Sequence, residues 1–158
     1  MARPMGAITV AAVGRLRARA WELAQQEYLG RLRHYTRLKL VEVKDAVGGA
    51  PDGVAMQQEG EALLKAVAGA QRVILLAPEG VEMGSPELAR FLQKEIEVYG
   101  RIAFLIGGPL GVSEAVLDAA HVRLSLSRLT FTHEMARVIL LEQLYRAFTI
   151  LHGERYHK

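Results

Sequence analysis

Short apolar runs recur along the chain and predict five β-strands, at residues 7–13, 38–43, 73–77, 102–106 and 122–126. Two of them, 73–77 and 102–106, are apolar throughout, which is typical of parallel strands covered on both faces. The run 38–43 alternates apolar and polar residues, as an edge or half-covered strand does. The pattern therefore favours a sheet with a buried centre.

Apolar residues at helical spacing predict a helix after each strand. These helices cover residues 18–35, 57–67, 85–99 and 114–120, and a long last one reaches about residue 151. Ser85 and Ser113 are placed to cap the third and fourth helices, and Gly100 to end the third. Residues 78–80 should end the third strand, and the stretch 45–55, rich in glycine and proline, should be a mobile loop.

This alternation of strand and helix implies an α/β sandwich with a mostly parallel sheet flanked by helices. At 158 residues the chain has the length of one domain, and it can bury roughly two thirds of its unfolded surface. We therefore expect residues 1–158 to form a single domain.

The last predicted helix is apolar nearly all the way round, with hydrophobic residues at 135, 138–141, 144, 147–148 and 150–151. Such a helix cannot leave one face in water. It needs the sheet on one side and another cover on the other, most simply a second copy of the chain, so the pattern predicts a homodimer. Glu142 lies within this helix, and we expect an arginine partner because an unpaired buried carboxylate is costly.

The composition of the chain excludes or disfavours several kinds of functional site. The chain has no cysteine, which excludes disulfides, thiolate zinc sites and cysteine nucleophiles. It has no HExxH motif and no carboxylate cluster at ligand spacing, so we expect no metal. No apolar run reaches the ~18 residues of a membrane span, and no signal peptide is recognised. A reducing cytoplasm is the expected location.

Positive charge is concentrated at the start of the chain. Residues 1–39 hold eight Lys and Arg against two Glu, a balance of +6 in a chain whose total is +3. Such asymmetry is typical of a polyanion binder. A solvated helix face explains the same charges equally well.

The glycine-rich segment 107–111 (GGPLG) follows the fourth predicted strand. It fits neither GxGxxG nor GxxxxGK[ST], so a phosphate loop and a simple sharp turn remain equally open. A conventional NAD site would place an acid after the next strand, whereas this chain has Ser127, Arg128 and Thr130 there. His133, at a helix start, favours a capping or packing role over that of a base.

Three segments carry a family resemblance: IGGPLGVS, LSLSRLTFTHEMARVILLEQLYRAFTI and the terminal GERYHK. Together with the LLAPEG turn they closely resemble the RlmH family, small bacterial ribosomal RNA methyltransferases of the SPOUT superfamily, over essentially the whole chain. The resemblance implies an α/β trefoil knot that binds S-adenosylmethionine. It also implies a homodimer that methylates N3 of a pseudouridine in 23S ribosomal RNA, acting on the assembled ribosome.

The resemblance further implies where the site lies. The cofactor pocket falls on Leu76, Gly107, Gly108, Leu126, Ser127, Arg128, Leu129, Thr130 and Phe131. The catalytic candidates are Arg137, Arg146, Arg155, Tyr156 and His157. Removal of the N3 proton invites a base or a cation from the tail, which is expected to reach the partner's pocket, while Arg137 and Arg146 would hold phosphate.

Two other functions compete with this one. A non-catalytic ribosome-binding factor would use the basic first quarter and a degenerate pocket, and a SPOUT methyltransferase could act on another RNA. The GGPLG and LSRLTF segments and the YHK tail are intact, which favours an enzyme. Pro109 and Leu110 replace small or acidic residues of the family, which changes the stiffness of the loop and leaves its backbone role.

Overall fold

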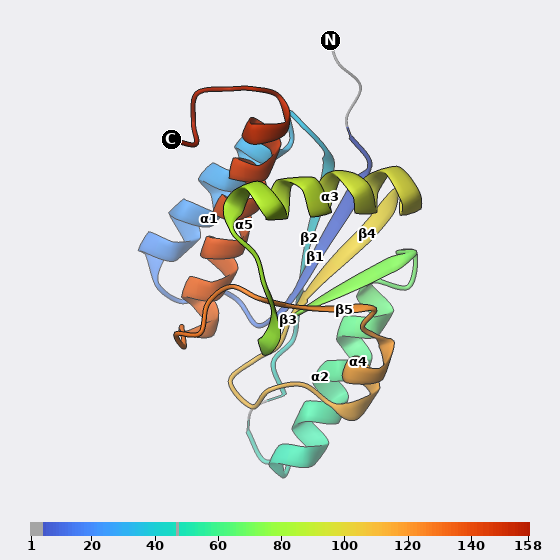
Figure 1. Cartoon of the computed structure of the whole chain (residues 1–158). Coiled ribbons are helices and arrows are strands. Elements are labelled where there is room, and N and C mark those ends of the chain that lie inside the picture. The colour runs from blue at the N-terminus through green and yellow to red at the C-terminus, as the bar shows by residue number, and fades with distance from the viewer. Residues whose placement is uncertain (1–4, 47) are drawn as a thin grey trace.

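The computed structural model describes residues 5–46 and 48–158, which form a five-stranded parallel sheet between two groups of helices (Figure 1). The strands are β1 (Ala7–Val13), β2 (Arg37–Val43), β3 (Arg72–Glu82), β4 (Arg101–Ile106) and β5 (Val122–Ser125). The helices are α1 (Arg19–Leu32), α2 (Asp52–Ala66), α3 (Ser85–Tyr99), α4 (Glu114–Ala119) and α5 (His133–Leu151). The strand order is β2-β1-β4-β3-β5, so the predicted α/β class is confirmed. The knot stays a prediction.

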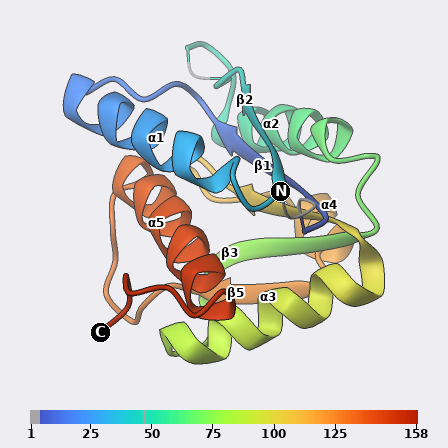
Figure 2. The same cartoon turned by 90° about the horizontal axis from the view of Figure 1, so that it is seen from above.

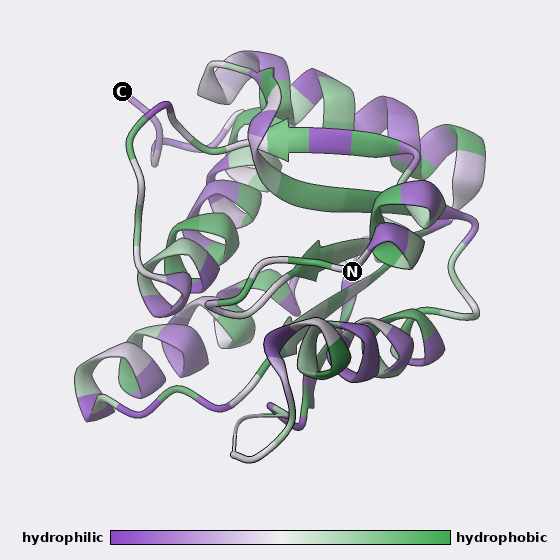
Figure 3. Cartoon of the chain, turned by 90° about the horizontal axis from the view of Figure 1, so that it is seen from below, coloured by the Kyte–Doolittle hydropathy of each residue, from purple (hydrophilic) through white to green (hydrophobic). Residues whose placement is uncertain are grey.

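The two faces of the sheet hold two separate hydrophobic clusters. In β1, Ile8 and Val10 face the cluster under α1, α3 and α5, whereas Ala11 and Val13 face the cluster under α2 and α4. Figure 2 shows these two groups of helices on opposite faces. Hydrophobic strands lie inside and helices of mixed polarity outside (Figure 3). Both faces of the central strands are therefore covered, as their apolar runs predict.

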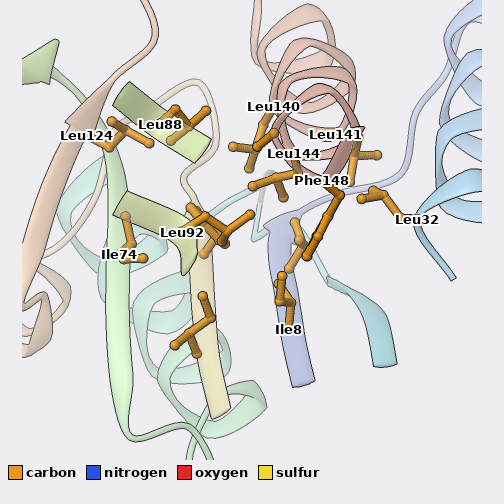
Figure 4. Packing of buried hydrophobic residues seen from close by; sticks show 14 of the residues in the cluster. Ile8, Leu32, Ile74, Leu88, Leu92, Leu124, Leu140, Leu141, Leu144 and Phe148 are labelled. Carbon is orange, nitrogen blue, oxygen red and sulfur yellow. The ribbon is translucent and has the colours of Figure 1, made fainter. Parts of the chain in front are cut away.

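Helix α5 is buried mainly within its own chain. Leu140, Leu141, Leu144 and Phe148 are fully buried between α1, α3 and the sheet (Figure 4). The expectation that a second copy must cover this helix is thus wrong for these residues, because two neighbouring helices cover them. An outer face with half-buried side chains remains, and the homodimer stays a prediction.

Several predicted boundaries are wrong. Strand β3 continues through residues 78–80 to Glu82, because Gly80 packs on the backbone of β5: a Cβ added there would lie 2.6 Å from the carbonyl carbon of Arg123. Helix α2 begins at residue 52 and shortens the predicted loop 45–55. Of that loop, residue 47 lies outside the described residues, as does Arg3 of the basic first quarter.

Two of the three predicted helix ends are confirmed and one is wrong. Gly100 ends α3 with φ of 73°, and the Ser113 side chain accepts a hydrogen bond at the start of α4, as predicted. Ser85 is not the cap of α3. Gly84 holds that position, and the Ser85 hydroxyl donates to Gln143 Oε1 at 2.7 Å, joining α3 to α5. No helix in the described part of the chain is long and apolar enough to cross a membrane.

Candidate active site

The residues expected to bind the cofactor lie in or directly after three neighbouring strands. Leu76 lies in β3, Gly107 and Gly108 follow β4, and residues 126–131 follow β5. Because β4, β3 and β5 are adjacent and parallel, these segments emerge at the same edge of the sheet. Parallel sheets of α/β proteins bind their ligands at this edge. The structure therefore brings the predicted pocket residues together.

The glycine segment after β4 is a tight turn. Gly111 N donates to Gly108 O at 3.0 Å, and Gly111 has φ of 90°, which favours glycine. A Cβ added to Gly107 would lie 2.6 Å from Cγ1 of Val112. The close approach of the chain to itself thus requires glycine at the mouth of the predicted pocket.

The segment after β5 is held by two local hydrogen bonds of its serines. Ser125 Oγ donates to Ser127 O at 3.0 Å, and Leu129 N donates to Ser127 Oγ at 3.0 Å. Among the described residues, no backbone–backbone hydrogen bond involves residues 128–131. Apart from Leu129 N, which donates to Ser127 Oγ, their amide and carbonyl groups remain available to a polar ligand, and this fits a nucleoside held by main-chain contacts.

The C-terminal tail packs on the outer face of α5. Tyr156 Oη donates to Glu142 Oε1 at 3.0 Å, and Arg146 donates to the same oxygen from Nε at 3.0 Å and Nη2 at 2.6 Å. Arg146 Nη1 lies 3.1 Å from His157 Nδ1. The expected arginine partner of Glu142 is therefore confirmed, and Glu142, Arg146, Tyr156 and His157 form what we call the tail cluster.

Two pKa values in the tail cluster are raised, those of Tyr156 and Arg146. The pKa of Tyr156 is raised first by desolvation, then by hydrogen bonds to Tyr28 and Glu142. The hydrogen bond to Glu142 raises the pKa of Arg146, against desolvation. The phenol thus stays protonated and the guanidinium charged, so both act as hydrogen-bond donors.

Aromatic side chains from α1 and α5 support the tail. The rings of Tyr145 and Tyr156 meet edge to face, with 4.7 Å between their centres, and Tyr28 lies 6.2 Å from Tyr145. Sequence reasoning assigned no functional part to Tyr28 or Tyr145. Their sequence signal, tyrosines at core-facing helical positions, is that of ordinary packing. Arg155 of the tail is exposed and lies outside the cluster.

Arg137 is not brought together with the tail. Its side chain is 1% exposed, pairs with Glu42 at 2.5 Å, and donates to Val13 O at 3.2 Å and Gly14 O at 2.8 Å. Burial lowers its pKa, while the hydrogen bond and charge of Glu42 act in the opposite direction. These contacts tie α5 to the ends of β1 and β2, and the expected phosphate-holding part of Arg137 stays a prediction.

A groove of about 1300 Å³ lies beside the predicted pocket. Arg15, Arg17 and Lys44 line it, and Pro109 of the glycine segment and His133 of α5 border it. Other cations of the first quarter lie elsewhere: Arg33, Arg37 and Lys39 line a second hollow of about 480 Å³, beside the start of β1. Among the described residues, these six cations therefore line two separate hollows.

No group of three or more His, Asp or Glu residues in the described part of the chain could hold a metal ion. The site residues are instead main-chain groups at the strand ends and the donors of the tail cluster. This donor set suits an organic ligand and an anionic reaction partner.

Comparison with known proteins adds the family. The family model described as "Predicted SPOUT methyltransferase" matches residues 7–157. The chain is 43% identical to "Ribosomal RNA large subunit methyltransferase H" of Halothermothrix orenii over 157 residues, covering 96% of this chain and 99% of that protein. It is 44% identical to the protein of the same name from Symbiobacterium thermophilum, with the same coverage.

Solved structures support the fold alone. A probable methyltransferase from Bordetella pertussis Tohama I has a TM-score of 0.58 at 15% identity, covering 89% of this chain and 93% of that one. TrmJ from Z. mobilis ZM4 has a TM-score of 0.52 at 16% identity, covering 94% of this chain and 71% of that one. Both are similar to this chain in the arrangement of strands and helices.

Proposed function

The chain belongs to the RlmH family of SPOUT methyltransferases, and from this membership we propose that it transfers a methyl group from S-adenosylmethionine to RNA of the large ribosomal subunit. The curated relatives bear that activity in their name and match over nearly their whole length. The finer proposal is that the target is N3 of a pseudouridine in 23S ribosomal RNA on the assembled ribosome, in the cytoplasm.

One observation supports the proposal most. The glycine turn after β4 and the segment 128–131 after β5 meet at one edge of the sheet, and the second offers main-chain groups that form no backbone–backbone hydrogen bond in the described chain. Adenine and ribose can be held by such groups without a metal ion. We place Leu76, Gly107, Gly108 and residues 126–131 at the cofactor.

The tail cluster supplies the other half of the chemistry. When bound, S-adenosylmethionine provides a methyl group on a positively charged sulfur. The protein must hold N3 of the base in line with that methyl group and exclude water. It must also stabilise the negative charge that N3 and its neighbouring oxygens carry when the N3 proton leaves. Arg146, Tyr156 and His157 are suited to this task as donors, and Arg155 and Arg137 lie outside the cluster.

The two halves of the site are far apart within one chain. Arg146 follows the cap of α5, Thr132, by fourteen residues, which corresponds to about 20 Å along a helix. The segment 126–131 lies directly before that cap, whereas the C-terminal tail leaves α5 at the other end of the helix (Figure 1). A homodimer in which each tail serves the partner's pocket would bring the halves together.

The function is tested on ribosomal RNA. Mass spectrometry of 23S ribosomal RNA from cells with and without the gene should show one methylated pseudouridine that depends on the gene. Purified protein with S-adenosylmethionine should restore it on ribosomes from the deletion strain. Protein lacking residues 156–158 should fold and bind the cofactor yet lose ~10² or more in rate. An unchanged RNA and no restoration would refute the proposed activity.

The exchange of tails is tested with mixed dimers. One protomer carries Gly107→Val and an intact tail, and the other lacks residues 156–158 and has an intact pocket. If tails serve the partner, each mixed dimer contains one intact site and should show about half the wild-type rate, since active sites contribute independently. Inactive mixed dimers would show that each tail serves its own chain.

We also propose that residues 1–158 act as a single domain. The same hydrophobic cluster contains Leu29 of α1, Leu92 of α3 and Leu144 of α5. A core shared by the first, middle and last parts of the chain supports one folding unit.

A further inference from the structure

We infer that His157 works as a neutral hydrogen-bond donor through Nε2–H, held in this tautomer by Arg146, and that it does not accept the N3 proton. The inference rests on the proposed function and deepens it. A tail histidine could serve as a base or as a donor, and the surroundings of its ring distinguish the two.

The contact with Arg146 assigns the tautomer. Arg146 Nη1 lies 3.1 Å from His157 Nδ1. A guanidinium has five N–H donors and no acceptor, so Nδ1 must offer its lone pair. A neutral imidazole whose Nδ1 accepts a hydrogen bond carries its proton on Nε2.

Glu142 fixes the guanidinium in the orientation that this contact requires. Its Oε1 accepts from Nε and Nη2 of Arg146 at 3.0 and 2.6 Å, which leaves Nη1 directed at the histidine. The Tyr156 hydroxyl donates to the same oxygen at 3.0 Å, and the guanidinium carbon lies 4.8 Å from the centre of the Tyr156 ring. Glu142 and Arg146 are therefore positioning residues for His157.

Two other histidines of the chain show both possible tautomers. His152 Nδ1 lies 2.8 Å from the carbonyl oxygen of Phe148. A carbonyl only accepts, so this ring carries its proton on Nδ1. His121 Nδ1 accepts from Val73 N at 2.9 Å, so this ring carries its proton on Nε2. His152 and His121 can therefore serve as reference signals for the Nδ1–H and the Nε2–H tautomer, respectively.

The Nε2–H group of His157 is free to donate a hydrogen bond. In the described part of the chain no hydrogen bond to His157 Nε2 is found. N3 of a pseudouridine lies between two carbonyl oxygens, which share the negative charge once N3 loses its proton. An N–H group aimed at one of them stabilises that charge, as in an oxyanion hole.

The proton balance follows from this assignment. In the proposed reaction N3 would bond to the methyl carbon, the sulfur would keep the electron pair of the bond that breaks, and the N3 proton would pass to a water molecule before the site excludes solvent. His157 remains neutral throughout. Because all four residues of the tail cluster belong to one chain, two of them in α5 and two in the tail after it, the same geometry holds whichever protomer supplies the pocket.

The tautomer is tested by ¹⁵N nuclear magnetic resonance of the purified protein, without substrate. His157 should resemble His121 and be opposite to His152, and a coupling across the hydrogen bond should join Arg146 Nη1 to His157 Nδ1. Arg146→Met should remove that coupling and leave His121 and His152 unchanged. A proton on Nδ1 of His157 in the wild type, or no coupling to Arg146, would overturn the inference.

The role is tested by donor replacement. His157→Gln places an amide N–H close to the position of Nε2 and has no basic nitrogen, whereas the shorter His157→Asn reaches only the position of Nδ1. Methylation by the Gln variant should stay within about tenfold of the wild type, and the Asn and Ala variants should lose ~10² or more, the usual effect of removing one such donor.

The controls separate this inference from the proposed function. All three variants should dimerise and bind S-adenosylmethionine as the wild type does. A Gln variant that is folded, binds the cofactor and is as slow as the Ala variant would contradict the donor role. If the wild type itself methylates no ribosomal RNA, the proposed function fails, while the resonance experiment still decides the tautomer.

Discussion

For the ion pair between Arg137 and Glu42 we predict that removing Glu42, the more exposed partner, costs more stability than removing the buried Arg137. The Arg137 side chain is 1% exposed and that of Glu42 is 29% exposed. After Arg137→Met, the carboxylate of Glu42 can recover water. After Glu42→Gln, the guanidinium loses the carboxylate that pairs with it while its side chain stays 1% exposed.

The magnitudes follow from this difference. Breaking a buried pair by removing one partner costs about 3–5 kcal/mol, and we assign that range to Glu42→Gln. Arg137→Met removes a donor from Val13 O, Gly14 O and Gln25 Oε1 but leaves no buried charge, so we expect about 2–3 kcal/mol. The double variant should be close to Arg137→Met alone, since the unpaired guanidinium is then gone.

Urea unfolding at fixed protein concentration measures these changes from the transition midpoints. Arg123→Met is the matched control, because its pair with Glu79 is 3.7 Å long and both side chains are largely exposed. It should change stability by about 0.5 kcal/mol or less. If Glu42→Gln costs less than Arg137→Met, the argument from buried charge is refuted.

Three further predictions concern the cofactor site, the core and alkaline pH. Gly107→Val should abolish S-adenosylmethionine binding in calorimetry, because the Cβ added at residue 107 would lie 2.6 Å from Val112 Cγ1. A chelator should leave wild-type binding unchanged, and chelator-sensitive binding would contradict a site without a metal ion. Leu144→Lys should unfold the chain by circular dichroism, since the residue is 0% exposed within its own core; a folded monomer would place it at an interface instead. Desolvation, then the hydrogen bond to Glu154, raises the pKa of Tyr35 above its usual 10.0. The contribution of this tyrosine to stability is therefore present below pH 10 and lost as pH rises further. The loss of stability caused by Tyr35→Phe should shrink above pH 10, and a loss that stays constant with pH would contradict this prediction.

The element order could be predicted because apolar strand runs and helical apolar spacing alternate along the chain. Parallel strands covered on both faces appear as continuous apolar runs, and residues 73–77 of β3 and 102–106 of β4 are of this kind. The end of β3 could not be predicted. Its residues 78–80 contain proline and glycine, which mark a break locally, whereas pairing of Val81 with Leu124 of β5 continues the strand. That pairing is a tertiary contact between segments far apart in the sequence.

In the candidate site, too, features set by the local sequence could be predicted and features set by tertiary contacts could not. Glycine at 107 follows from the sharp exit of a strand, and a partner for Glu142 follows from the cost of a buried charge. The inward orientation of Arg137 could not be predicted, because it depends on where the ends of β1 and β2 lie. Nor could the packing of the tail, which depends on Tyr145 and Glu142 presenting one surface on the outside of α5.

Helix α5 connects these findings, since its start adjoins the segment 126–131 and its outer face carries the tail cluster. Its inner face is fixed by Leu140, Leu144 and Phe148 in the core. In the proposed dimer, this helix would set the distance between the pocket of a protomer and the donors that the same protomer offers to its partner. A twofold axis uses the same surface on both chains, so the contact that completes one site completes its equivalent as well. In the proposed dimer, association and catalytic competence are therefore a single event, and dilution to monomer should abolish methyl transfer without loss of the fold around α5.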